Sequence, residues 1–249
     1  MSERAYAALL RLYPAGHPRD EMLGVLLEAD RPMWREVGPL VLGGLRARSG
    51  GDQSIAVKWL YAARAAALML LVVSALIPVR DVATGWLTLT AAQVLVWIAA
   101  GLAVVAVIAG LRVPAAALAL ITFVLSASAG GDWRAVVGYS LAAALLVIPG
   151  PRTPVHSPLP LLLALAAMSG DPVVTSPFLT LAVVVLVWTV VDERLALAVG
   201  LALCTVLVQA VPELPGDARG LLIVAAWRLG PVVFFLALGT ALAIRRARV

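Results

Sequence analysis

The 249-residue sequence is poor in the residue types that cover the surface of a soluble protein. Charged residues make up 13% of the chain and aromatic residues 6%, whereas apolar residues make up 62%. A soluble monomer of this size could not remove so much apolar surface from water. The composition therefore excludes a soluble enzyme and predicts an integral membrane protein whose first partner is the lipid bilayer.

Cysteine and histidine are almost absent. The single cysteine, Cys204, excludes a disulfide framework and any site with several cysteine ligands. His17 and His156 both fall in expected loops, so no pair of histidines on one helix can bind zinc. The motifs of intramembrane serine and aspartyl proteases and the phosphate-binding glycine loop are missing as well. We therefore expect no enzyme activity, no metal and no cofactor.

A strong excess of positive charge is missing from the first part of the chain. Residues 1–58 carry eight cations and seven acids, including Lys58, the one lysine of the protein. A domain that binds nucleic acid needs a large cationic excess to neutralise phosphates. The near-neutral balance argues against direct contact with nucleic acid and favours a protein partner.

Residues 1–58 show the pattern of three short amphipathic helices. The first is predicted over residues 3–12, the second starts near Pro18, and the third begins after Asp30. Gly38-Pro39 is the place where the third helix would break. Their apolar stripes are Tyr6, Leu9, Leu10 and Tyr13, then Met22, Leu23, Leu26 and Leu27, then Trp34, Val37, Val41 and Leu45. We expect a cytoplasmic module, and the candidate partner-docking residues are Tyr13, Arg19, Glu21, Trp34 and Arg35. The alternative is that the helices only pack on one another or lie on the membrane face.

Residues 59–249 are predicted to form a transmembrane helix bundle. Short Pro, Gly and Asp segments separate eight apolar runs, at 59–77, 86–111, 113–128, 133–148, 159–169, 173–191, 195–211 and 220–244. A helix needs about 20 residues to cross the hydrocarbon core, and the fifth run, Leu159–Ser169, is clearly shorter. It is therefore either a crossing in a thin region or a half-helix buried among the others. The predicted fold class is all-α, a polytopic bundle of about eight transmembrane helices with a small N-terminal three-helix module.

The arginines predict the orientation of this bundle. With a cytoplasmic N-terminus and eight crossings, one side carries the eight cations of residues 1–58 together with Arg112, Arg152, Arg194, Arg245, Arg246 and Arg248. The opposite side carries Arg80, Arg134 and Arg219. Both termini are therefore predicted to lie in the cytoplasm, with the bundle in a bacterial inner membrane.

Few polar residues fall inside the apolar runs or at their edges. Arg64 is expected to extend toward the cytoplasmic interface, and Gln93 and Gln209 to form hydrogen bonds between helices. The segment Asp192-Glu193-Arg194 is expected to be a solvated turn. Four acids mark the predicted outer turns, namely Asp81, Asp132, Asp171 and Asp217. Helix N-capping explains three of them, and a ring of carboxylates that attracts a cation is the alternative.

Arg228 is the candidate intramembrane polar site. It lies well inside the last run, beside Gly230-Pro231, where a kink would free backbone carbonyls. A charge at that depth is unfavourable by at least roughly 2.5–3.5 kcal/mol unless it is paired or hydrated. The side chain either extends outward or caps carbonyls at the kink, or it contacts an anion or a lipid headgroup in an outward-facing cavity.

The first 48 residues carry a family resemblance. Its motifs are Leu9-Leu10-Arg11-Leu12-Tyr13-Pro14, His17-Pro18-Arg19-Asp20-Glu21-Met22-Leu23, Trp34-Arg35-Glu36-Val37 and Gly44-Leu45-Arg46-Ala47-Arg48. Over about residues 5–48 the chain resembles actinobacterial membrane proteins encoded beside PadR-like transcription regulators, in their helix-turn-helix-associated α-helical signalling (HAAS) module. The resemblance implies a protein-contact module coupled to a membrane sensor or transporter. Two functions stay open: a membrane-linked signalling partner of a cytoplasmic protein, and a small transporter or permease subunit. A scaffold for a partner complex is a third.

Overall fold

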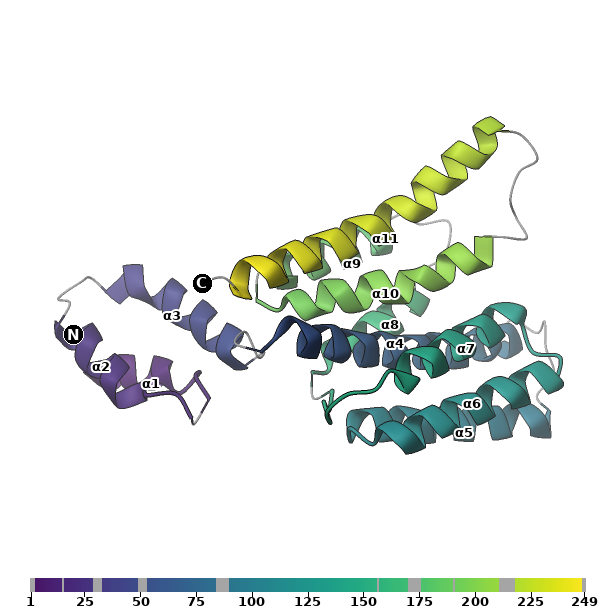
Figure 1. Ribbon diagram of the computed structural model, residues 1–249, viewed down its shortest axis with the longest axis horizontal. Coiled ribbons are helices and arrows are strands. Elements are labelled where there is room, and N and C mark those ends of the chain that lie inside the picture. Colours follow the sequence, from purple (N-terminus) through teal and green to yellow (C-terminus); the bar gives the residue numbers. More distant parts are fainter. Residues whose placement is uncertain are drawn as a thin grey trace.

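The computed structural model describes residues 3–14, 16–28, 33–48, 53–83, 90–155, 157–169, 176–189, 191–210 and 218–247. Within these ranges the chain forms eleven α-helices and no strand (Figure 1). The helices are α1 (Glu3–Leu10), α2 (Arg19–Glu28), α3 (Met33–Arg48), α4 (Ile55–Ala83), α5 (Ala91–Ile108), α6 (Arg112–Ser128), α7 (Trp133–Val147), α8 (Leu159–Ser169), α9 (Ser176–Thr189), α10 (Glu193–Ala210) and α11 (Ala218–Ala247).

Each of the eight apolar runs coincides with one helix, from α4 to α11. Three segments are long and apolar enough to cross a membrane, namely Ile55–Val79, Ala91–Ile108 and Leu222–Arg246. Three is fewer than the eight crossings that the sequence predicts. The helix α8 has the 11 residues expected of the shortest run.

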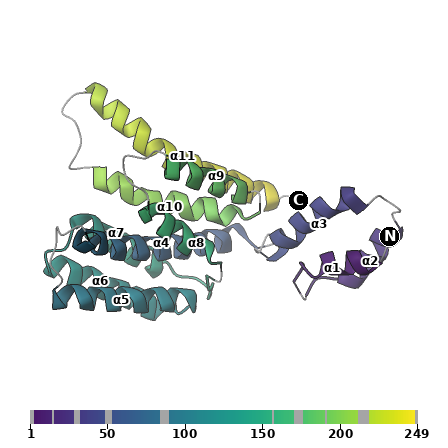
Figure 2. The ribbon, with the colours of Figure 1, turned by 180° about the vertical axis from the view of Figure 1, so that it is seen from behind.

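The helix α4 is the centre of the bundle. It packs against α7 and α10, and also against α8, α5 and α11. Figures 1 and 2 show α5 and α6 on one side of α4, α10 and α11 on the other, and α7 level with α4. In an 18-residue apolar stretch of α4, 67% of the residues are buried, compared with 17% in a stretch of the same length in α11. The helix α11 packs almost entirely on α10. One helix therefore forms the interior, and another presents most of its surface outward.

Small side chains let these helices approach closely. The core around α4 is rich in alanine, including Ala62, Ala65, Ala66, Ala103, Ala115, Ala119, Ala135 and Ala142. Gly200 of α10 leaves room for Leu236 of α11, and a Cβ at Gly200 would lie 2.7 Å from Leu236. The reciprocal arrangement occurs at Gly239 of α11, where a Cβ would lie 2.7 Å from Leu197 of α10. Close backbone approach of this kind is typical of helices that associate in membranes.

Local caps determine where several helices begin and end. Asp132 caps α7, because its carboxylate accepts a hydrogen bond from the backbone N–H of Arg134 at 2.9 Å, which confirms the capping interpretation at that residue. Gly110, with φ of 71°, follows α5 and forms its turn to α6. Asp81 lies in the last turn of α4, whereas Asp171 and Asp217 lie outside the described residues.

The two glutamines differ from each other. Gln209 of α10 donates a hydrogen bond to the carbonyl oxygen of Arg134 in α7 at 3.2 Å, which confirms an interhelical role. The same expectation is wrong for Gln93. Its side chain accepts from the backbone N–H of Thr90, and the Thr90 hydroxyl accepts from the N–H of Gln93, so the pair forms a capping box at the start of α5.

The first three helices pack around a small core of their own. Tyr6, Leu10 and Tyr13 contact Leu40 of α3, with Met22, Leu23 and Leu26 of α2 packed against them. Two expectations are wrong in detail. The helix α3 runs through Pro39 without a break, and Leu27 is 45% exposed rather than part of the core. We call residues 3–48 the head; it lies at one end of the bundle (Figures 1 and 2).

Candidate functional site

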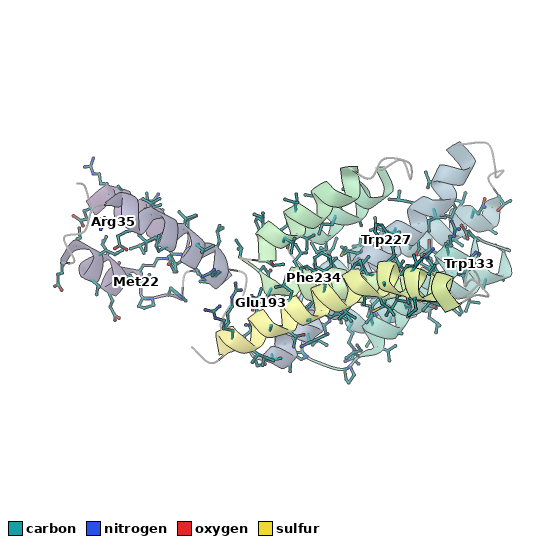
Figure 3. All side chains as sticks on the ribbon, turned by 90° about the horizontal axis from the view of Figure 1, so that it is seen from above. Met22, Arg35, Trp133, Glu193, Trp227 and Phe234 are labelled. Atoms are coloured by element: carbon teal, nitrogen blue, oxygen red, sulfur yellow. The ribbon has the colours of Figure 1, made fainter. Side chains whose placement is uncertain are left out.

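The largest group of buried charges lies at the end of the bundle nearest the head, which we call the head-proximal end. Three helix ends meet there: the first turns of α4, the first turn of α10 and the last turns of α11. They bring together Lys58, Asp192, Glu193, Arg194 and Arg246, which we call the Glu193 cluster. Figure 3 shows Glu193 at this end of the bundle, with Trp133 at the other.

Glu193 is the centre of the cluster and is 2% exposed. One carboxylate oxygen, Oε1, lies 2.7 Å from the ammonium nitrogen of Lys58, which is itself completely buried. The other oxygen, Oε2, accepts a hydrogen bond from the guanidinium group of Arg246. Arg246 also donates to the carbonyl oxygens of Thr189 and Val191 at 3.5 Å. One carboxylate therefore joins α4 to α11 from its position on α10.

Asp192 and Arg194 form a second ion pair beside the first. The guanidinium group of Arg194 donates to both carboxylate oxygens of Asp192, at 2.9 and 3.0 Å. Asp192 also accepts from the backbone N–H of Arg194 at 3.0 Å, so it caps the start of α10. The same guanidinium group lies 4.1 Å from the ring centre of Tyr61 on α4 and donates to Gln53, just before α4, at 3.4 Å. The cation–π contact ties this pair to α4 as well.

The expectation of a solvated Asp192-Glu193-Arg194 turn is wrong, because all three residues are buried. A cluster of this kind adds little net stability when intact, because desolvation of the charges offsets their attraction. Removing one partner is different, since it leaves a buried charge unpaired, at a penalty of about 3–5 kcal/mol. The turn Asp192-Glu193-Arg194 itself resembles an ordinary surface turn. The sequence feature that could have indicated a buried ion pair was Lys58, the one lysine, because it lies next to an apolar run.

Another buried cation at the same end, Arg64, has no acidic partner among the residues that the structure describes. Arg64 of α4 is 3% exposed, and it donates to the carbonyl oxygen of Pro151 at 2.7 Å and to the hydroxyl of Thr153. Both acceptors lie in the segment between α7 and α8, so the side chain clamps that segment to α4. Arg64 is therefore buried beneath that segment, and whether this end lies at a membrane interface stays a prediction.

Arg228, the candidate intramembrane site, is half-buried in α11, which continues through Pro231 as one helix. A shallow apolar groove runs along α11 and is lined by Val233, Leu236, Ala237, Thr240, Ala241 and Ile244. Arg228 does not line this groove. Whether Arg228 contacts an anion stays a prediction.

The candidate docking residues of the head differ in their exposure. Tyr13 is buried in the head core, where burial raises the pKa of its hydroxyl, and its carbonyl oxygen accepts a hydrogen bond from Arg19. Glu21 and Arg35 are exposed, on α2 and α3 respectively. Trp34 lies in α3, and its side chain is outside the described part of the chain. Partner docking through these residues stays a prediction.

No group of three or more His, Cys, Asp and Glu side chains that could hold a metal occurs among the described residues. Cys204 is half-buried, and its sulfur atom contacts the carbonyl oxygen of Gly200 at 3.5 Å. In comparisons with known proteins, the chain matches no family model, no curated protein and no solved structure. The resemblance of residues 5–48 to the HAAS module therefore stays a prediction.

Proposed function

We propose that this chain is a polytopic protein of a bacterial inner membrane that relays a signal between the membrane and a cytoplasmic protein. In this proposal residues 59–249 cross the bilayer eight times, and residues 1–58 form a cytoplasmic module. The module docks a protein and does not contact nucleic acid directly, and no residue has a catalytic role. A PadR-like regulator is the candidate partner that the HAAS-like motifs imply.

The observation that carries the proposal is the attachment of the head to the bundle. The start of α4, the first bundle helix after the head in the sequence, lies in the Glu193 cluster: Gln53, just before α4, contacts Arg194, and Lys58 contacts Glu193. The cluster also includes the last turns of α11. A rearrangement of α10 or α11 in the membrane would therefore change the contacts that hold the start of α4. The ion pairs of the Glu193 cluster could therefore couple a conformational change in the bundle to the position of the head.

The surface of the head supports a protein partner. Val25 and Leu27 of α2 are 66% and 45% exposed, and the charged residues Asp20, Glu21 and Glu28 lie on the same helix. The helix α2 has no fully buried residue, so most of its side chains are accessible. Val25 and Leu27 are two positions apart and lie on different sides of α2, so each offers a separate apolar contact next to charged residues.

The alternative function is transport, as a small transporter or a permease subunit. Transport of a charged substrate needs a polar path through the membrane. In the described part of the bundle, the hydroxyl groups of Thr122, Thr205 and Thr240 all donate to carbonyl oxygens of their own helices. The described core is otherwise rich in alanine and leucine. These observations favour signalling, although an apolar substrate would tolerate such an interior.

The proposed topology has a direct test. Reporter fusions after Val249 and near Ser54 should both report a cytoplasmic location, because the arginine-rich side contains both positions. A periplasmic C-terminus would mean an odd number of crossings, and α8 would then be the helix that does not cross.

The proposed signalling role is tested with the full chain in native membranes. Cross-linking should capture a specific cytoplasmic protein with the wild type, and charge reversals at Asp20, Glu21 and Arg35 should abolish the capture at unchanged protein level. Reversal at Arg4, an exposed residue of α1, is the matched control and should leave capture intact. Equal capture by all variants, or capture of a membrane-bound ATPase through the bundle, would favour the transporter alternative.

A further inference from the structure

Arg64 differs from the cations of the Glu193 cluster in what surrounds it. It is 3% exposed, and its hydrogen-bond acceptors are neutral oxygens of Pro151 and Thr153. Among the described residues, the charge that acts on it is another cation, Arg112, at the start of α6. A buried charge is normally paired with an opposite charge, and here the described residues supply none.

The segments that pack around Arg64 carry two further arginines. The segment between α7 and α8 lies against α4 at Gly150, which contacts Leu60. It also lies against the turn between α5 and α6, where a Cβ at Gly110 would be 3.2 Å from Pro154. This packing places exposed Arg152, between the two acceptors of Arg64, in the same region as half-buried Arg112. The segments that carry Arg112 and Arg152 therefore both pack beside the buried Arg64 at the head-proximal end.

The start of α6 has the polarity that an anion requires. Leu111 occupies the N-cap position and makes no side-chain hydrogen bond to the first turn. The backbone N–H groups of Arg112 and Val113 and the helix dipole give this end a partial positive charge, which the Arg112 side chain increases; Pro114 supplies no N–H. An anion would be stabilised there by the helix and the arginines together.

We propose that Arg64, Arg112 and Arg152 form a binding site for a phosphate-bearing anion. Arg64 supplies a fixed, buried charge, whereas Arg112 and Arg152 lie at the accessible edge and contact the phosphate oxygens directly. Arginine fits this role because its planar donors match phosphate geometry. The phosphate belongs either to an anionic lipid headgroup or to a soluble phosphate. The lipid source rests on the proposed placement of this end at a bilayer surface, where basic groups between helices bind such headgroups.

The test uses the full chain in nanodiscs of phosphatidylcholine, with and without phosphatidylglycerol, and measures the thermal unfolding midpoint and the lipids retained in native mass spectrometry. Phosphatidylglycerol should raise the midpoint of the wild type and be retained. Arg112→Gln and Arg152→Gln should each weaken retention about fivefold, as expected for one cation near the membrane surface. Neither variant disturbs the buried Arg64 clamp, so folding is preserved.

Arg245→Gln is the matched control, because Arg245 is an exposed arginine at the same end of the bundle. It should bind phosphatidylglycerol as the wild type does. A second arm adds inorganic phosphate to discs of phosphatidylcholine alone. Stabilisation in that arm, lost in Arg112→Gln and kept in Arg245→Gln, identifies a soluble phosphate as the ligand.

Two results would overturn the site. Equal weakening in Arg112→Gln, Arg152→Gln and Arg245→Gln would show a general surface potential, and no response to either phosphate source would show that Arg64 is only a structural clamp. Neither result bears on capture of a cytoplasmic protein by the head, so failure of the site and failure of the signalling proposal are distinguishable.

Discussion

The Glu193 cluster and the Arg64 site both bury positive charge at the head-proximal end, but they neutralise it differently. At the Glu193 cluster, two acids lie among three cations, and Glu193 alone contacts Lys58 and Arg246. At the Arg64 site, the buried cation contacts only neutral oxygens of Pro151 and Thr153 among the described residues. The cations of the Glu193 cluster pair with acids of the same chain, and these ion pairs connect three helices. In our proposal the Arg64 site takes its counter-charge from a bound phosphate, so its contribution to stability should depend on the lipid or phosphate present.

The largest effect is expected for Glu193→Gln. The substitution leaves Lys58 and Arg246 close together without a counter-charge in a buried place, and we expect a loss of about 3–5 kcal/mol in stability. Thermal or chemical unfolding in nanodiscs measures the loss. The double variant Lys58→Met with Glu193→Gln should recover part of it, because one of the two unpaired charges is gone. A stability unchanged by Glu193→Gln would contradict the role of the cluster in connecting three helices.

A smaller effect is expected for Arg64→Gln. Its removal leaves neutral acceptors short of a donor and leaves no charge unpaired, so the loss should be about 1–3 kcal/mol. The comparison sharpens when lipids are varied. The loss should be greater in discs with phosphatidylglycerol than in phosphatidylcholine alone, whereas the loss in Glu193→Gln should be the same in both. If the loss of stability in Arg64→Gln were the same with both lipids, the proposed difference between the Arg64 site and the Glu193 cluster would be contradicted.

A third substitution, Asp132→Ala, examines the opposite end of the bundle. It removes the side-chain cap of α7, and N-cap losses are typically about 1 kcal/mol. Unfolding in the same discs should show this loss with every lipid, because no buried cation depends on Asp132. Asp132→Asn keeps an acceptor at the cap and should retain most of the stability. A lipid-dependent effect at Asp132 would mean that the lipid response is not confined to the Arg64 site.

The smallest effect on folding is expected for Arg228→Leu. If the side chain only extends outward from α11, its loss should change stability by less than about 0.5 kcal/mol, as is usual for accessible positions, and membrane insertion should improve slightly. Protein level and unfolding midpoint measure both. Loss of the signalling or transport phenotype at unchanged protein level would instead support an anion or an acidic partner at Arg228. Glu213 and Asp217 are the acids from the sequence that could pair with it.

The positions of the bundle helices could be predicted from the sequence, and their packing could not. Apolar runs bounded by Pro, Gly and Asp gave all eight helices from α4 to α11, because lipid and core both select apolar side chains. Because these runs are apolar on every side, the sequence does not show which face of a helix packs against the other helices. Nothing in the runs themselves distinguishes α4, which is mostly buried, from α11, which is mostly exposed.

The polar residues show the same limit. Asp132 was predictable as a cap because the partner of a cap is local in sequence. Glu193 was mistaken for a residue of a solvated turn, and the contacts of Arg64 were missed, since the partners of both are 53 to 135 positions away in the chain. In the head, the stripe of α1 was sufficient to find Tyr6 and Leu10, whereas Leu40 of α3 was missed because the predicted stripe followed Val37 and Val41.

The central place of α4 has a consequence for synthesis. This helix leaves the ribosome before all the helices that cover it, and α10, which supplies Glu193, begins about 110 residues after α4 ends. At bacterial rates of about 5–20 residues per second, that interval lasts roughly 5–20 s. During this time Lys58 lacks its partner Glu193, and Arg64 gains Pro151 and Thr153 earlier, about 70 residues after α4 ends. If α4 crosses the bilayer as proposed, these two charges need water or protein around them until the later parts of the chain arrive.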